Sequence, residues 1–109
     1  MIPADVYKEF VVRGTEWADK LGAAELLEGA LKSLKAHYIL KAKRDMSCSM
    51  AEAAERALDC QEYREAYEES VEARVAANKA KVRYDATKAL FDAQRTAEAS
   101  ERAAMRAAP

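Results

Sequence analysis

The stretch that decides the fold runs from residue 49 to residue 108 and reads SMAEAAERALDCQEYREAYEESVEARVAANKAKVRYDATKALFDAQRTAEASERAAMRAA. It opens with Ser49-Met50-Ala51-Glu52, a capping box in which the serine hydroxyl and the glutamate side chain satisfy backbone N–H groups of a first helical turn. The stretch has no glycine and no proline, the usual helix breakers, and it contains 18 alanines. It predicts one long helix over residues 49–107.

The first half of the chain predicts a shorter helix over residues 4–44. Pro3 suits a first turn, and Arg44 suits the negative C-terminal end of a helix. Its apolar residues recur at spacings of three, four or seven and lie on one side, the contact face: Val6, Phe10, Trp17, Ala24, Leu27, Leu31, Leu34 and Tyr38. Glycine weakens a helix by up to about 1 kcal/mol, so a break near Gly14 or Gly22 is one expectation.

A turn at residues 45–48 would make the two helices antiparallel neighbours, because a short connection leaves no other arrangement. The predicted fold is therefore all-α, an antiparallel helical hairpin resembling a coiled coil, with residues 1–109 as a single helical domain. Folding about residue 47 places Phe10 near Tyr84. Only 28 residues are large and apolar, so a monomer would have a thin core, and assembly into a helical-bundle oligomer is expected.

The longer helix carries two apolar faces. One face alternates by three and four residues and is assigned to the hairpin contact: Tyr63, Ala66, Ser70, Ala73, Ala77, Ala80, Tyr84, Thr87 and Phe91. The second, on the opposite side, is called the outer face: Tyr67, Val71, Val75, Val82, Ala86, Ala89 and Ala93. Alanines alone would need no burial, but valine is a weaker helix former that packing usually selects. We therefore predict that the outer face is an oligomer or partner interface.

A row of cations repeats at heptad spacing beside the hairpin face, and it is called the basic ladder: Arg74, Lys81, Lys88, Arg95 and Arg102. Such positions ordinarily pair with charges of a neighbouring helix. The residues expected opposite the ladder include only one acid, Glu28. The unpaired cations would then meet acids of a second chain, or the phosphates of a nucleic acid.

Charge patterning also concerns residues 52–72, which are strongly acidic. Basic residues of the first helix lie opposite them in the predicted hairpin: Lys32, Lys35, Lys41, Lys43 and Arg44. We interpret the acidic run as their complement rather than as a mimic of DNA. The net charge of −1 gives no general attraction to nucleic acid or to a membrane surface.

No catalytic motif, metal-ligand set or phosphate-binding loop is evident, so neither enzymatic activity nor a cofactor is expected. His37 is the only histidine and suits an exposed flank better than a catalytic or metal-binding role. Cys48 and Cys60 fit no recognised motif and are interpreted as free thiols of a reducing cytoplasm. The sequence shows no signal peptide and no apolar run long enough to span a bilayer, so no membrane association is expected.

Residues 47–106 resemble small helical proteins of unassigned role that bacteriophages encode, often near recombination and replication genes. The resemblance lies in Ser47-Cys48-Ser49-Met50-Ala51-Glu52, Tyr63-Arg64-Glu65, Ala73-Arg74, Ala77-Asn78-Lys79-Ala80, Tyr84-Asp85-Ala86-Thr87-Lys88-Ala89-Leu90-Phe91-Asp92-Ala93, Arg95-Thr96 and Glu101-Arg102-Ala103-Ala104-Met105-Arg106.

That resemblance implies a non-catalytic phage accessory protein in the host cytoplasm. The leading hypothesis is a helical interaction and assembly protein that acts as an accessory in DNA recombination or replication. The alternatives are nucleic-acid binding through the basic ladder, and inhibition of a host defence or repair protein through the acidic residues 52–72.

Overall fold

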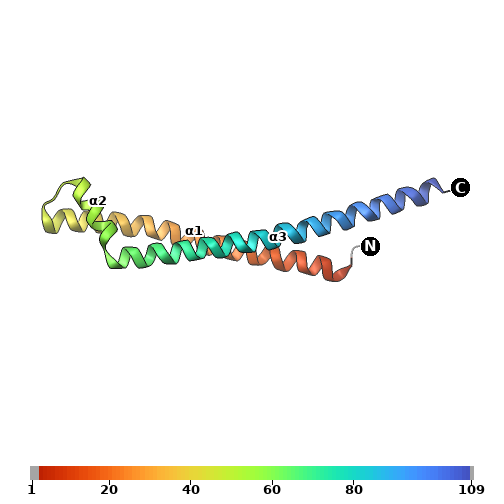
Figure 1. The fold of residues 1–109 in the computed structure, drawn as a ribbon, viewed down its shortest axis with the longest axis horizontal. Coiled ribbons are helices and arrows are strands. Elements are labelled where there is room, and N and C mark those ends of the chain that lie inside the picture. Colours follow the sequence, from red (N-terminus) through yellow and green to blue (C-terminus); the bar gives the residue numbers. More distant parts are fainter. Residues whose placement is uncertain (1–2, 109) are drawn as a thin grey trace. The chain divides into compact units, whose positions relative to one another are not determined.

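The computed structural model describes residues 3–108, and these residues form three helices (Figure 1). Helix α1 covers Ala4–Met46, α2 covers Met50–Asp59 and α3 covers Gln61–Ala107. No strand occurs between residues 3 and 108. The all-α prediction is therefore confirmed.

The helices divide between two compact units, one formed by the chain up to residue 19 and from residue 78 onward, the other by residues 20–77. In the first unit the ring of Phe10 stacks on Phe91, with 4.8 Å between centroids, and lies 5.5 Å from Tyr84. In the second unit Glu28 pairs with Arg74, and Tyr38 donates a hydrogen bond to Glu62. Within each unit α1 and α3 therefore run in opposite directions, as a hairpin requires. That residues 1–109 form a single domain stays a prediction.

Helix α1 is continuous, so the expected break near Gly14 or Gly22 is wrong. At Gly14 the absence of a side chain admits an aromatic ring, since a Cβ atom there would lie 3.3 Å from Cε2 of Tyr84. At Gly22 no atom lies within 4 Å of the equivalent Cβ position. The packing of the flanking residues offsets the propensity cost of glycine, about 1 kcal/mol per residue.

The connection after α1 covers residues 47–49, so it begins two residues later and ends one residue later than predicted. Ser47 takes up a left-handed conformation with φ of 48°, and its N–H donates to the carbonyl of Lys43 at 3.1 Å, which ends the helix. Ser49 then begins α2, because its Oγ accepts the N–H of Glu52 at 3.2 Å. The predicted N-cap is confirmed.

The prediction of one helix over residues 49–107 is wrong at Cys60. This residue has an extended conformation, φ −68° and ψ 130°, and it separates α2 from α3. If the helix continued straight from Tyr63, Arg56 and Asp59 would occupy the inward positions seven and four residues earlier. The break instead buries Ala53 and Ala57 while Arg56 and Asp59 stay exposed. Burying two charges without partners would cost far more than the lost helical hydrogen bonds.

The core is thin, as the composition predicts. Among residues 3–108 the buried apolar residues are almost all alanines: Ala24, Ala42, Ala53, Ala57, Tyr63, Ala77 and Ala80. No large side chain in this part of the chain is fully buried. All positions assigned to the contact face of α1 and to the hairpin face of α3 are buried or half-buried, so both assignments are confirmed.

Candidate interaction surface

The outer face of α3 is exposed in both units. In the unit of residues 20–77, Tyr67, Val71 and Val75 expose 52%, 44% and 45% of their surface. In the other unit Val82 exposes 68%, and Ala86, Ala89 and Ala93 are also exposed. Helix α1 covers the apolar side chains of the hairpin face, whereas no other part of the described chain covers those of the outer face. The structure thus leaves a second apolar surface available to another molecule.

The apolar surface of α3 continues beyond the residues predicted for it. In the unit that contains residues 78–108, Leu90 is 51% exposed, and Ala97, Ser100, Ala103, Ala104 and Ala107 are exposed as well. Here α3 extends past the beginning of α1, and its last turns have no α1 beside them (Figure 1). Sequence reasoning overlooked this part, although spacings of three and four residues continue from Ala93 to Ala107 and could have identified it.

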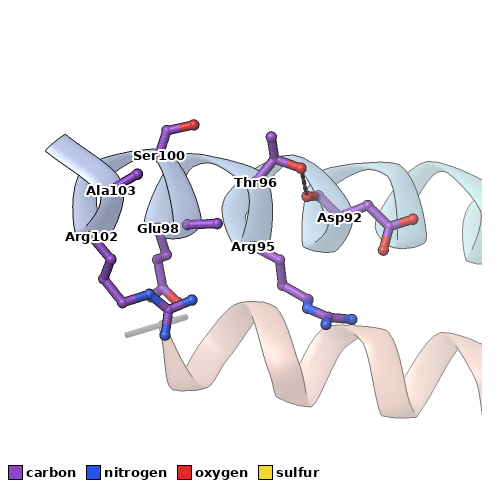
Figure 2. A pocket seen from close by; sticks show the side chains of 8 residues that line it. Asp92, Arg95, Thr96, Glu98, Ser100, Arg102 and Ala103 are labelled. Atoms are coloured by element: carbon purple, nitrogen blue, oxygen red, sulfur yellow. Dashed lines mark hydrogen bonds between the residues drawn. The ribbon is translucent and has the colours of Figure 1, made fainter. Parts of the chain in front are cut away.

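Charged and uncharged side chains lie on different sides of this C-terminal part of α3. Figure 2 shows Arg95 and Arg102 projecting toward one side of the helix, while Thr96 and Ser100 project from the opposite side. A shallow groove of about 690 Å³ is lined by both charged and uncharged side chains: Asp92, Arg95, Thr96, Glu98, Ala99, Ser100, Arg102 and Ala103. The charged and the uncharged side chains of this part of α3 therefore border the same groove.

The basic ladder is only partly free. Arg74 makes a two-pronged hydrogen bond to Glu28, with Nε–Oε2 of 2.8 Å and a second N–O distance of 2.5 Å. Glu28 is the one acid expected opposite the ladder, so Arg74 is used inside the chain. The guanidinium of Arg95 lies 6.0 Å from the centroid of the Phe91 ring. Lys81, Lys88 and Arg102 are exposed and make no ion pair within residues 3–108.

The ion pairs between α1 and α3 hold two carboxylates in the ionised form. Hydrogen bonds from Arg74 lower the pKa of Glu28 below its ordinary value. Glu16 accepts hydrogen bonds from Arg83 at 2.6 Å and from Arg13 at 3.1 Å. Both lower the pKa of Glu16, and the bond from Arg83 has the larger effect. Both pairs place the acid on α1 and the arginine on α3.

The predicted complement between residues 52–72 and the lysines of α1 is not made by direct ion pairs in the described chain. Apart from Arg74–Glu28 and Arg83–Glu16, the ion pairs found in residues 3–108 are local, such as Arg64–Asp59 at 3.1 Å. An acidic side chain of this run does contact α1 through the hydrogen bond that Tyr38 donates to Glu62. Lys32, Lys41 and Lys43 are exposed and Lys35 is half-buried, and an ion pair between exposed side chains would add little stability.

The remaining candidates for chemistry are isolated. His37 is exposed beside Tyr38, with 5.3 Å between ring centroids. Cys48 and Cys60 are half-buried free cysteines, and the thiol of Cys48 lies 3.7 Å from the carbonyl oxygen of Ala42. Within residues 3–108 no three His, Cys, Asp or Glu side chains are grouped so as to hold a metal ion. The helices described there also lack any segment with the length and apolar character of a membrane span.

No family model, curated protein or solved structure matches this chain.

Proposed function

We propose that this protein is a non-enzymatic helical interaction protein that assembles through the outer face of α3. The observation that carries the proposal is the exposure of a second apolar surface on a helix whose first apolar surface is already covered by α1. A helix that only completed a hairpin would bury one face and expose polar residues on the other. Three exposed valines, Val71, Val75 and Val82, are the strongest departure from that pattern.

The thin core supports the same proposal. Alanine contributes little apolar area, and the described chain buries almost no large side chain. Association would remove further apolar surface from water at about 25 cal/mol per Å², which stabilises the folded chain together with the assembly. Small exposed alanines also permit the close helix approach that makes such contacts dense.

Sedimentation of the purified protein at several concentrations tests assembly directly. We expect an oligomer, and we expect Val75→Asp or Val82→Asp to dissociate it, because an aspartate in an apolar contact loses its solvation. The loss of a buried valine alone, about 1.5 kcal/mol or more per copy, would raise the dissociation constant roughly 100-fold for two copies. Val11→Asp on α1 is the matched control for Val75→Asp, since Val11 exposes 46% and Val75 45%. An unmodified protein that sediments as a monomer at all concentrations would refute the proposal.

The biological setting that we propose comes from the sequence resemblance of residues 47–106. It is an accessory role in phage DNA recombination or replication, within the host cytoplasm. The genes adjacent to this one provide the simplest test, because recombination or replication genes beside it would support that setting. Neighbours with unrelated roles would count against it without affecting the proposal of assembly.

A second candidate function is nucleic-acid binding, and the exposed part of the basic ladder favours it. Lys81, Lys88, Arg95 and Arg102 recur every seven residues and are exposed. Such a row can follow a phosphate backbone without reading base sequence. Acids on the same helix, among them Asp85 and Asp92, restrict the basic surface to a narrow stripe.

Titration of labelled single- and double-stranded DNA at low and high salt tests this second function. Binding through four cations should weaken steeply with salt, with a slope of about −3 to −4 on logarithmic axes. Lys88→Gln should reduce that slope by about one, whereas Lys79→Gln, outside the ladder, should leave it unchanged. The absence of binding at low salt would exclude the function.

A further inference from the structure

We infer that the C-terminal part of α3 pairs with the same part of a second copy in antiparallel orientation, a proposal that rests on the assembly proposed above. The pairing surface is called the C-terminal seam, and it lies within the unit that contains residues 78–108. Its residues alternate strictly by four and three positions: Val82, Ala86, Ala89, Ala93, Thr96, Ser100, Ala103 and Ala107. This spacing is the seam pattern of a coiled coil.

The C-terminal seam is uncharged along its whole length and uncovered in the structure. All eight of its residues are exposed, and Val82 exposes 68% of its surface. Leu90 borders the seam and is 51% exposed. It lines an open groove of about 590 Å³ with Ala93 and Ala97, and Glu98 and Glu101 line the side of this groove away from the seam. Before Val82, the same two helical rows carry Lys79, then Val75, then Glu72, so charged residues interrupt the uncharged surface there. The apolar surface therefore has a definite beginning, and in the described chain it ends with α3 itself at Ala107.

The charges that border the seam indicate what covers it. One flanking row, spaced by sevens, consists of Asp85, Asp92, Ala99 and Arg106, with acids at its start and a base at its end. In an antiparallel pair this row faces the same row of the partner in reverse order. When the two seams overlap fully, so that Val82 faces Ala107 of the second copy, Asp85 of each chain meets Arg106 of the other. The row is therefore complementary to itself.

A parallel pair would not use these charges. In that arrangement the row that contains Asp85 and Asp92 faces the opposite flank, which carries Leu90, Ala97 and Ala104. Acidic side chains would then border apolar ones without an ionic partner. The same flank also carries one charged residue, Arg83, which is already bound to Glu16 of α1. Antiparallel self-pairing is thus the arrangement that matches both the length of the seam and its charges.

Charge reversal tests the register. We expect Asp85→Arg and Arg106→Asp each to raise the dissociation constant of the dimer about tenfold, since each replaces two attractions by two repulsions. The double variant D85R/R106D should return it to within about threefold of the original value. Asp92→Arg is the control, because it changes an acid of the same row that faces Ala99 of the partner. Circular dichroism establishes that each variant keeps its helices.

The orientation has a separate test that does not depend on those variants. With Cys48 and Cys60 changed to serine, a spin label on Ala107→Cys gives one label per chain. In the antiparallel register the two labelled positions are separated by 25 residues along the helix axis, about 37 Å, whereas a parallel pair brings them to about 10 Å. Pulsed electron paramagnetic resonance distinguishes the two distances.

The outcomes separate the two proposals. A separation near 37 Å, together with recovery in the double variant, supports antiparallel pairing. A dimer with labels about 10 Å apart, or one that the double variant fails to restore, overturns this inference and leaves assembly through α3 intact. Val75 lies outside the seam, so this inference narrows the expectation given for the outer face: Val82→Asp dissociates the dimer and Val75→Asp leaves it intact. An oligomer that Val75→Asp dissociates but Val82→Asp does not overturns the inference. A monomer at every concentration overturns both.

Discussion

The contact between Phe10 and Phe91 provides the sharpest test of how α1 and α3 are held together in the unit that contains both. The two rings stack with centroids 4.8 Å apart, and Phe10 also lies 5.5 Å from Tyr84. Truncation of a fully buried phenylalanine costs about 3–5 kcal/mol, and Phe10 is half-buried. We therefore expect Phe10→Ala to reduce the free energy of unfolding by about 2 kcal/mol.

A double-mutant cycle isolates the aromatic contact itself. The single variants Phe10→Ala and Phe91→Ala and their combination should give a coupling free energy of about 1 kcal/mol, the usual size for a stacked aromatic pair. Val12→Ala is the control, because Val12 is 56% exposed on the same helix. Its cost should stay below about 0.5 kcal/mol. Valine and phenylalanine gain similar helix propensity on replacement by alanine, so the comparison cancels that effect.

Urea unfolding at a fixed protein concentration measures these differences, because assembly would otherwise contribute to stability. Circular dichroism follows the helices. The fluorescence of Trp17 follows the aromatic cluster, since its ring lies 5.0 Å from that of Tyr84. If Phe10→Ala costs no more than Val12→Ala, or if the coupling is near zero, α1 and α3 do not pack through these rings and the reasoning is refuted.

Three further predictions concern local features of the helices. Gly22→Ala and Gly29→Ala should each stabilise the protein in the same urea assay by about 0.8–1 kcal/mol, because no neighbouring group lies within 4 Å of the new methyl groups. Gly14→Ala should gain less, because its methyl group would lie 3.3 Å from Tyr84. Equal gains at all three sites would contradict the close approach at Gly14. Ser49→Ala should lower the stability of α2 by about 1 kcal/mol and speed hydrogen exchange at the Glu52 amide, whose N–H donates to the serine hydroxyl at 3.2 Å. Unchanged exchange would mean that the cap contributes nothing. Stability should also depend on pH through Glu28 and Glu16, because the pKa of each carboxyl group is lower in the folded chain than in the unfolded chain. Between the lowered pKa values and about pH 4.3, the unfolded chain therefore binds more protons than the folded chain. The stabilisation is fully present above about pH 4.3 and is lost as the pH falls through the lowered pKa values. Urea titrations of E16Q/E28Q from pH 3 to pH 7, roughly the range of carboxyl titration, should show a shallower dependence than the original protein, and an unchanged slope would show that the pairs do not form.

Much of the interaction surface could be read from the sequence, because it depends on periodicity along one helix. The hairpin face and the outer face of α3 were distinguished by spacing, and the structure covers the first and exposes the second. The first four residues of the C-terminal seam belong to the predicted outer face. Its remaining residues, Thr96, Ser100, Ala103 and Ala107, were overlooked because they include no valine or other large apolar residue. The role of Arg74 was half foreseen: its acid, Glu28, was identified, but only the structure shows the two-pronged pair.

The sequence by itself determined the helices, because capping, propensity and apolar spacing act between residues a few positions apart. The Ser49 cap, the contact face from Val6 to Tyr38 and the antiparallel course of α1 and α3 all follow from such local signals. Only the tertiary structure decided that α1 continues through Gly14 and that the chain breaks at Cys60. At Gly14 an aromatic ring from α3 uses the space that a side chain would fill. At Cys60 the break keeps Arg56 and Asp59 in water, which depends on where the inward face of α3 points. Both outcomes depend on contacts between residues distant in sequence, and no local preference at either position encodes them.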